Sequence, residues 1–143
     1  MYIVSACLLG VDCKYNGGNN KEDRIIDYLE GKSYVPICPE QLGGLTTPRN
    51  PVEIVNGKFK DAQGTDFTKN FVKGAEESLK IIELIKNVDA IILKEGSPSC
   101  GVNKIYDGTF TNRKIKGVGG TAQLLKEKKY NVISEKELLE KIK

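Results

Sequence analysis

Three of the four cysteines in this chain each follow a short hydrophobic run of the kind that forms β-strands. In chain order, Cys7 follows residues 2–6, Cys38 follows residues 34–37, and Cys100 follows residues 90–94 after a short turn. If these runs are parallel strands of one sheet, their carboxyl ends lie at one edge, where open α/β sheets bind ligands. Three thiolates meeting there, in a chain without histidine, favour a soft metal centre. Among such centres we expect an iron–sulfur cluster.

Three protein ligands rather than four would change what the metal centre can do. A cluster held by three thiolates leaves one iron open, and that iron can polarise a substrate atom as a Lewis acid. A three-thiolate zinc site with an open position is the chemical alternative, and another is that the cysteines are small core residues. The turn sequences around residues 38–40 and 97–101 argue against the core role. Cys13 could be a fourth ligand, a spare thiol or a bystander, and we favour an accessory thiol or a bystander.

Polar residues beside these cysteines are candidates for proton transfer. Glu40 lies two residues after Cys38, where a carboxylate could act as general base or acid. The alternative for Glu40 is an ordinary loop carboxylate or a helix cap. Ser97 and Ser99 flank a proline just before Cys100. We expect one of their hydroxyls to donate to a substrate oxygen or to position a water, although serines also form turns.

Two further segments are candidates for substrate binding. Gly119, Gly120 and Thr121 belong to a glycine-rich stretch that opens a predicted helix, and N–H groups at such an end can bind an anion or a carbonyl oxygen. Arg49 lies in a stiff loop between prolines. Its guanidinium either contacts a substrate phosphate or carboxylate or forms a structural ion pair.

Strands alternate with helices along the chain. The hydrophobic patterns predict strands at residues 2–6, 34–37, 90–93 and 131–133, and helices at about 22–31, 66–87, 121–128 and 135–142. Residues 52–60 predict a β-hairpin with a type I′ turn at Asn56-Gly57, residues 39–51 a loop, and residues 105–110 a short strand or turn. The order predicts one domain, residues 1–143, with an α/β fold: a Rossmann-like three-layer sandwich with a mainly parallel sheet and a small β-hairpin.

The bulk composition excludes several classes of protein. The chain has 143 residues and a net charge of only +3, so a nucleic-acid partner is possible but not favoured. Its apolar runs are too short to span a membrane, and its start does not resemble a signal peptide. We therefore expect a cytoplasmic protein without a membrane partner, and its size is compatible with a homodimer. In that compartment cysteines serve as metal ligands or reactive thiols more often than as disulfides.

Four motifs together resemble the thiouracil desulfidase (TudS-like) family, small bacterial and archaeal proteins long catalogued as a domain of unknown function. They occupy, in order, residues 5–10, 38–49, 97–101 and 106–110. The resemblance covers nearly the whole chain and implies a [4Fe-4S] cluster held by Cys7, Cys38 and Cys100. It further implies that the open iron binds the sulfur of 2- or 4-thiouracil while Glu40 activates water or moves protons. A serine of the loop before Cys100 would assist, with Ser97 slightly favoured.

The activity that this resemblance implies is the non-redox removal of sulfur from thiolated pyrimidines, which gives uracil and hydrosulfide. The expected substrate is a small thiolated base or nucleoside, because the modest positive charge disfavours a large RNA footprint. Two other classes of function stay open. One is a non-catalytic iron–sulfur or sulfide-binding module, such as a sulfur carrier or redox sensor, and the other is a zinc-thiolate protein.

Overall fold

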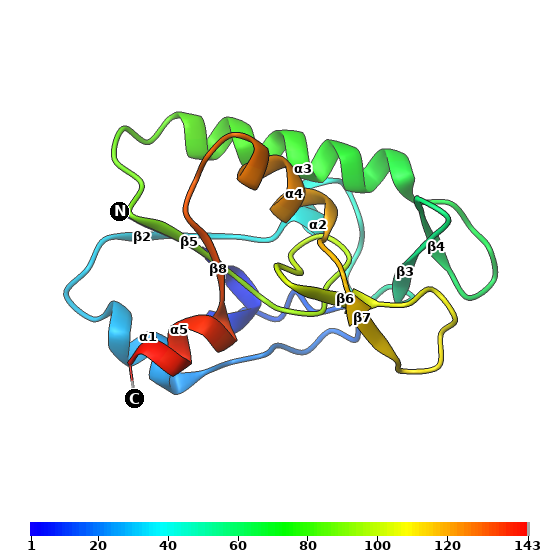
Figure 1. The fold of residues 1–143 in the computed structure, drawn as a ribbon, viewed down its shortest axis with the longest axis horizontal. Helices are drawn as coiled ribbons and strands as arrows, with labels where there is room; N and C mark the ends of the chain where they lie inside the picture. Colours follow the sequence, from blue (N-terminus) through cyan, green and yellow to red (C-terminus); the bar gives the residue numbers. More distant parts are fainter. Residues whose placement is uncertain (143) are drawn as a thin grey trace.

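A four-stranded parallel sheet forms the centre of the fold (Figure 1). The structure is a computed structural model, and it describes residues 1–142. The strands lie in the order β2 (Tyr34–Ile37), β1 (Tyr2–Ser5), β5 (Ala90–Leu93) and β8 (Val132–Ser134). All three neighbouring pairs are parallel, so the carboxyl ends of the strands share one edge of the sheet.

Helices cover both faces of this sheet, as Figure 1 shows. One face carries α2 (Pro39–Leu42), α3 (Thr68–Glu83) and α4 (Gly120–Glu127), and the other carries α1 (Asp23–Leu29) and α5 (Glu135–Lys141). Successive strand residues point to opposite faces, so Ile3 packs in the core under α3 while Val4 packs in the core under α1. These three layers confirm the predicted α/β sandwich with a parallel sheet.

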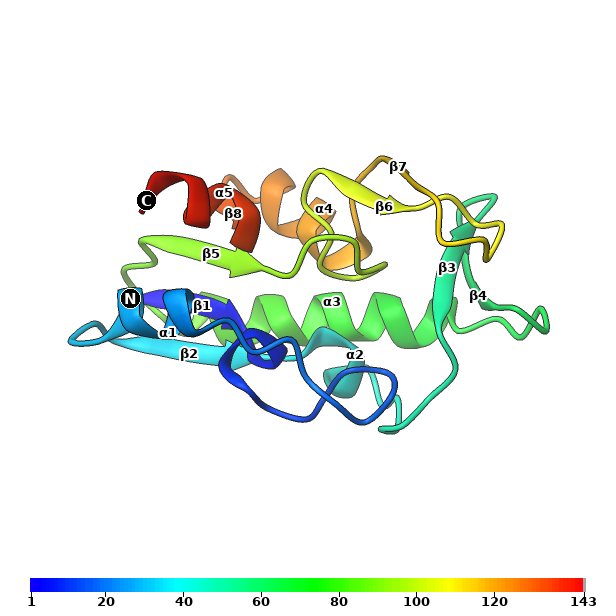
Figure 2. The ribbon, with the colours of Figure 1, turned by 90° about the horizontal axis from the view of Figure 1, so that it is seen from below.

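Two antiparallel hairpins lie beyond the carboxyl ends of the strands (Figure 2). The first joins β3 (Val52–Val55) to β4 (Lys58–Asp61). Its turn residues Asn56 and Gly57 both have positive φ, as the predicted type I′ turn requires. The second joins β6 (Lys104–Tyr106) to β7 (Lys114–Lys116). The sequence indicated only a short strand or turn here, because β7 is three exposed residues with no apolar pattern.

Several element bounds differ from those expected. The first strand ends at Ser5, and a 3-10 helix, η1 (Ala6–Leu9), follows it, so Cys7 lies in a helical turn. The short helix α2 occupies the start of the predicted 39–51 loop, because proline suits the first position of a helix. The helix α3 is shorter than predicted at both ends. None of the helices in the described part of the chain is long and apolar enough to cross a membrane.

Candidate metal centre and active site

All four cysteines line one cavity at the carboxyl edge of the parallel sheet. The cavity has a volume of about 790 Å³. Cys7 lies in η1 after β1, Cys38 lies between β2 and α2, and Cys100 lies in the turn after β5. Three adjacent strands therefore bring the three predicted ligands to one place. Cys13 reaches the same cavity from the loop between η1 and α1.

The four thiols differ in how readily they ionise. Burial raises the pKa of Cys100 to about 12 and also raises that of Cys7. A hydrogen bond from the Cys13 thiol lowers the pKa of Cys38 to about 7, and the same contact raises the pKa of Cys13. Cys38 is therefore the thiol that most readily becomes a thiolate, with Cys13 as its hydrogen-bond donor.

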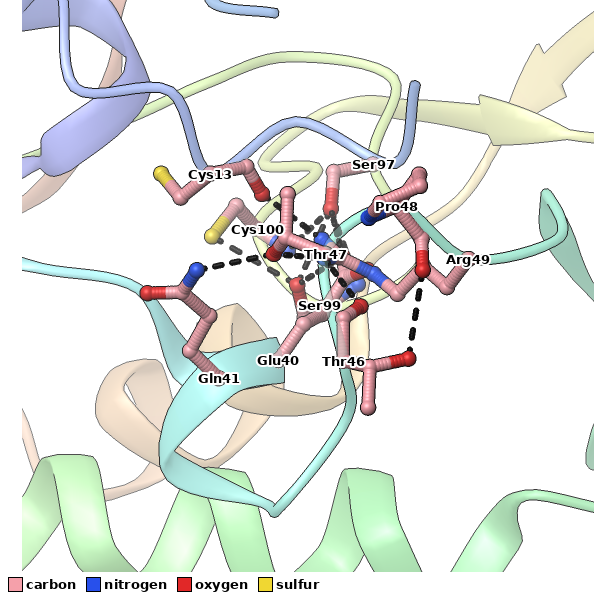
Figure 3. Close-up of polar contacts among 10 residues, drawn as sticks. All are labelled: Cys13, Glu40, Gln41, Thr46, Thr47, Pro48, Arg49, Ser97, Ser99 and Cys100. Carbon is pink, nitrogen blue, oxygen red and sulfur yellow. Dashed lines mark hydrogen bonds and ion pairs between the residues drawn. The ribbon is translucent and has the colours of Figure 1, made fainter. Parts of the chain in front are cut away.

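Glu40 is the centre of a polar network beside the cysteines (Figure 3). Its Oε2 accepts hydrogen bonds from the Ser97 hydroxyl at 3.1 Å and the Ser99 hydroxyl at 2.9 Å. Its Oε1 accepts one from Nε of Arg49 at 3.1 Å. The two serine oxygens lie 3.0 Å apart. The carboxylate is thus fixed on both sides, and the structure brings both candidate serines to the same oxygen.

Arg49 directs its N–H groups toward protein acceptors (Figure 3). Nη1 donates to the Thr46 carbonyl at 3.1 Å and the Thr47 hydroxyl at 3.0 Å. Nη2 donates to the Cys13 carbonyl at 2.9 Å and lies 3.1 Å from Oε1 of Glu40. These contacts occupy the donors of the guanidinium fork. They favour the structural ion pair, so Arg49 orients Glu40 and ties the Cys13 loop to it.

The glycine-rich start of α4 holds the serine–cysteine loop in place. The Gly120 N–H donates to the Pro98 carbonyl and the Thr121 N–H donates to the Ser99 carbonyl, each at 2.9 Å. A Cβ on Gly119 would lie only 2.6 Å from the Ser99 carbonyl carbon, so the close approach requires glycine. The structure therefore uses Gly119, Gly120 and Thr121 to position the loop, and it does not bring them into the wall of the cavity.

Glu95 is a buried carboxylate whose role the sequence analysis missed. Its Oε1 accepts backbone N–H groups from Val102 at 2.7 Å, Asn103 at 2.9 Å and Lys104 at 3.0 Å. Burial alone would raise its pKa, but these donors outweigh burial and lower it. Glu95 thus closes the loop that carries Cys100. In the sequence, Glu95 is only a charged residue next to a buried strand. That position does not reveal which backbone N–H groups its carboxylate binds.

The four cysteines that line the cavity come from four different segments of the chain. Within residues 1–142, no group of three or more Cys, Asp or Glu side chains is placed to hold a metal ion. A single zinc ion needs its thiolates at about 2.3 Å from one centre. In an iron–sulfur cluster the thiolates bind different irons, so the sulfurs can stand further apart. Three thiols that line one cavity are the type of ligand that such a cluster takes.

Comparison with known proteins places this chain in a family. The family model for 2-thiouracil desulfurase matches residues 2–137. The chain belongs to the 2-thiouracil desulfurase family. Another protein similar to it is the uncharacterized protein YbbK of Bacillus subtilis (strain 168), which is 45% identical over 148 residues, covering 96% of this chain and 97% of YbbK.

A solved structure of a protein named TudS is also similar. TudS is described as a [4Fe-4S]-dependent thiouracil desulfidase, and it shares 39% identity with this chain at a TM-score of 0.89. The match covers 97% of this chain and 93% of the TudS chain. The family match and this structural match confirm the predicted family and the predicted fold of this 2-thiouracil desulfurase family member.

Proposed function

We propose that this protein is a [4Fe-4S]-dependent desulfidase that replaces the sulfur of a thiolated pyrimidine, such as 2- or 4-thiouracil, with oxygen. The observation that carries this proposal is the carboxylate–hydroxyl network of Glu40, Ser97 and Ser99 on the wall of the cavity that four cysteines also line. Family membership and the similarity to TudS support it.

Cys7, Cys38 and Cys100 would hold the cluster, while Cys13 would remain a thiol beside Cys38. The three come from the ends of adjacent strands, and thiolates are the ligands that iron–sulfur clusters take. When bound, the cluster supplies an iron without a protein ligand, which acts as a Lewis acid toward a thiocarbonyl sulfur. Ligands bind as thiolates, so loading releases protons, including that of the buried Cys100.

Glu40 would move the protons of the reaction. Its Oε2 faces the two serine hydroxyls, which can hold a water within reach of the carboxylate. Glu40 accepts a proton from that water while the water oxygen attacks the ring carbon. The carboxyl group then returns this proton to the departing sulfur as the carbon–sulfur bond breaks, and the sulfur leaves as hydrosulfide. Arg49 holds Oε1 throughout, so Oε2 is the oxygen that exchanges the proton.

The reaction balances without an electron donor or acceptor. One water supplies the oxygen of the new carbonyl group, and its two hydrogens leave with the sulfur as hydrosulfide and a proton. A small thiolated base or nucleoside is the proposed substrate, because the net charge of +3 provides little attraction for a long nucleic acid.

Two alternative functions are less well supported by the site. A zinc-thiolate protein would also use cysteine ligands, but family membership and the similarity to TudS, which is described as [4Fe-4S]-dependent, support an iron–sulfur cluster instead. A sulfide-binding or redox-sensing module would have no use for a half-buried carboxylate held by an arginine and two serines. The Glu40 network therefore favours a catalyst over both.

Anaerobic cluster reconstitution followed by assay of the same sample tests the proposal. We expect about four irons and four sulfides per chain, and equal amounts of uracil and hydrosulfide from 2- or 4-thiouracil. A loaded protein that turns over neither compound would contradict the desulfidase proposal. A protein that takes up zinc but no iron would contradict the proposed cofactor.

A further inference from the structure

The cavity has a second wall that the proposed chemistry does not use. It is formed by residues of the two hairpins, among them Val52, Tyr106 and Phe110. In Figures 1 and 2 the loop between β6 and β7 meets β3 beyond the end of the sheet. This loop carries the motif at residues 106–110, to which the mechanism above assigns no role.

A buried carboxylate fixes the shape of this loop. Glu53 on β3 is 8% exposed, and its Oε1 accepts the backbone N–H groups of Gly108 at 2.9 Å and Phe110 at 3.2 Å. Gly108 has φ +90°, and a Cβ there would lie 2.6 Å from the Ile54 carbonyl oxygen. The loop is therefore pressed against β3 at a position that admits only glycine.

The loop also has its own internal hydrogen bonds. The Asp107 carboxylate accepts the N–H and the hydroxyl of Thr109 at 2.9 Å and 2.6 Å. The Thr109 hydroxyl lies 2.6 Å from that of Thr111, and the Asp107 N–H donates to the Arg113 carbonyl at 2.9 Å. These bonds give Phe110 a fixed backbone on either side.

Phe110 has an unusual backbone conformation for its size. Its φ is +60°, in the left-handed region that bulky residues rarely adopt. Residues in such conformations persist where their surroundings hold them, and they gather at functional sites. Within the part of the chain that the structure describes, Phe110 belongs to neither buried core cluster. Phe110 is instead half-buried and is one of the residues that line the cavity.

We infer that Phe110, positioned by Glu53, is the surface on which the substrate ring stacks, so that the enzyme selects planar heteroaromatic thiocarbonyl compounds. The inference rests on the proposed function and says which substrates the proposed enzyme selects. A thiocarbonyl group directed at the cysteines and Glu40 leaves the rest of the ring to the hairpin wall. Aromatic side chains bind such rings through their faces.

Substitution of Phe110 separates this role from a structural one. Phe110→Gly removes the backbone strain at this position, because glycine adopts positive φ without a steric penalty. The melting temperature of the variant should therefore not fall below that of the wild type. The affinity for uracil, measured by titration calorimetry, should nevertheless drop roughly tenfold, as expected for the loss of one base–aromatic stack. KM for 2-thiouracil should rise by a similar factor while kcat changes much less. Phe110→Tyr keeps the ring and should resemble the wild type.

Three controls sharpen the test. Ile115→Ala removes an exposed apolar side chain from β7 of the same hairpin, outside the cavity wall. This substitution should change neither the affinity for uracil nor KM for 2-thiouracil. Glu53→Ala should weaken uracil binding as Phe110→Gly does, whereas Glu53→Gln keeps an acceptor and should restore most of it. The puckered 5,6-dihydro-2-thiouracil stacks poorly on an aromatic ring. The Phe110→Gly substitution should therefore reduce the affinity for this compound less than it reduces the affinity for 2-thiouracil.

Failure of this inference can be told apart from failure of the proposed function. Unchanged uracil affinity and KM in Phe110→Gly, with the wild type active, would overturn the stacking role alone. A loaded wild type that binds uracil but turns over no thiouracil would contradict the proposed function, and the uracil titrations would still report on the stack. Absence of any ring binding by the wild type would also contradict the inference.

Discussion

The Ser99 hydroxyl donates a hydrogen bond of 2.9 Å to Oε2 of Glu40, although 59 positions separate the two residues in the chain. The contact crosses the sheet edge, because Glu40 follows β2, Ser99 follows β5, and β1 lies between these strands. The same hydroxyl lies 3.6 Å from the Cys100 sulfur. One side chain thus links the proposed proton carrier to a proposed cluster ligand.

The two serines should respond differently to substitution. Ser97 also accepts the backbone N–H groups of Ser99 and Cys100, each at 3.2 Å. Ser97→Ala should therefore lower both kcat and the free energy of unfolding, the latter by about 1 to 2 kcal/mol. Ser99→Ala should lower kcat with a smaller change in stability. Urea unfolding and turnover of the same samples measure both effects, and equal stability losses would contradict the structural role of Ser97.

Arg49 should affect the rate of turnover but not the cluster content of the protein. Lysine at this position keeps the charge but cannot reproduce the planar fork of hydrogen bonds. We expect Arg49→Lys to lower kcat about tenfold, because Glu40 loses its fixed orientation, a positioning effect of the kind that small misplacements produce. Iron content per chain should stay unchanged. A loaded Arg49→Lys enzyme with wild-type kcat would show that the ion pair does not orient the carboxylate for catalysis.

The four cysteines should divide into three ligands and one accessory thiol. Substitution of Cys7, Cys38 or Cys100 by alanine should abolish formation of the brown cluster, because each substitution removes one of the three thiolate ligands. Cys13→Ala should still take up about four irons per chain. Iron analysis and absorption spectra after anaerobic reconstitution measure this. A colourless Cys13→Ala protein that is otherwise folded would make Cys13 a ligand.

The cluster-free protein should show a single reactive thiol near neutral pH. Cys38 has its pKa lowered to about 7 by the hydrogen bond from Cys13, whereas burial raises the pKa of Cys7 and Cys100. Thiolates are the reactive form, so alkylation of Cys38 should rise as pH increases through about 7 and slow below it. Mass spectrometry after timed iodoacetamide treatment locates the label.

The Cys13→Ala variant provides the control for that titration. Without the Cys13 donor, the pKa of Cys38 should return toward its ordinary value, so the rise in labelling should move to higher pH. Labelling that begins at Cys100, or a Cys38 profile identical in both proteins, would contradict the assigned hydrogen bond.

The sequence predicted the parts of the site that depend on strand ends. Residues at the carboxyl ends of adjacent parallel strands must meet, so the positions of Cys7, Cys38 and Cys100 follow from three short hydrophobic runs. Glu40 follows from its proximity to Cys38. Neither inference needs any knowledge of how the loops pack.

The sequence could not predict the contacts that loops make with distant loops. Arg49 has two chemically reasonable roles, and only its acceptors on Thr46, Thr47 and Cys13 distinguish them. The N–H groups at the start of α4 looked available for substrate, but the loop before Cys100 supplies their acceptors. Glu53 and Glu95 bind backbone groups far along the chain, which no local pattern reveals.

The most direct test of the account compares the wild-type protein with Glu40→Gln at equal cluster content. Glutamine keeps the size of the side chain but cannot accept the proton, so we expect the cluster to form normally. Hydrosulfide release from 2-thiouracil should fall about 100-fold or more, the usual contribution of a general base. A Glu40→Gln enzyme that carries a full cluster and releases hydrosulfide at the wild-type rate would contradict the proposed mechanism.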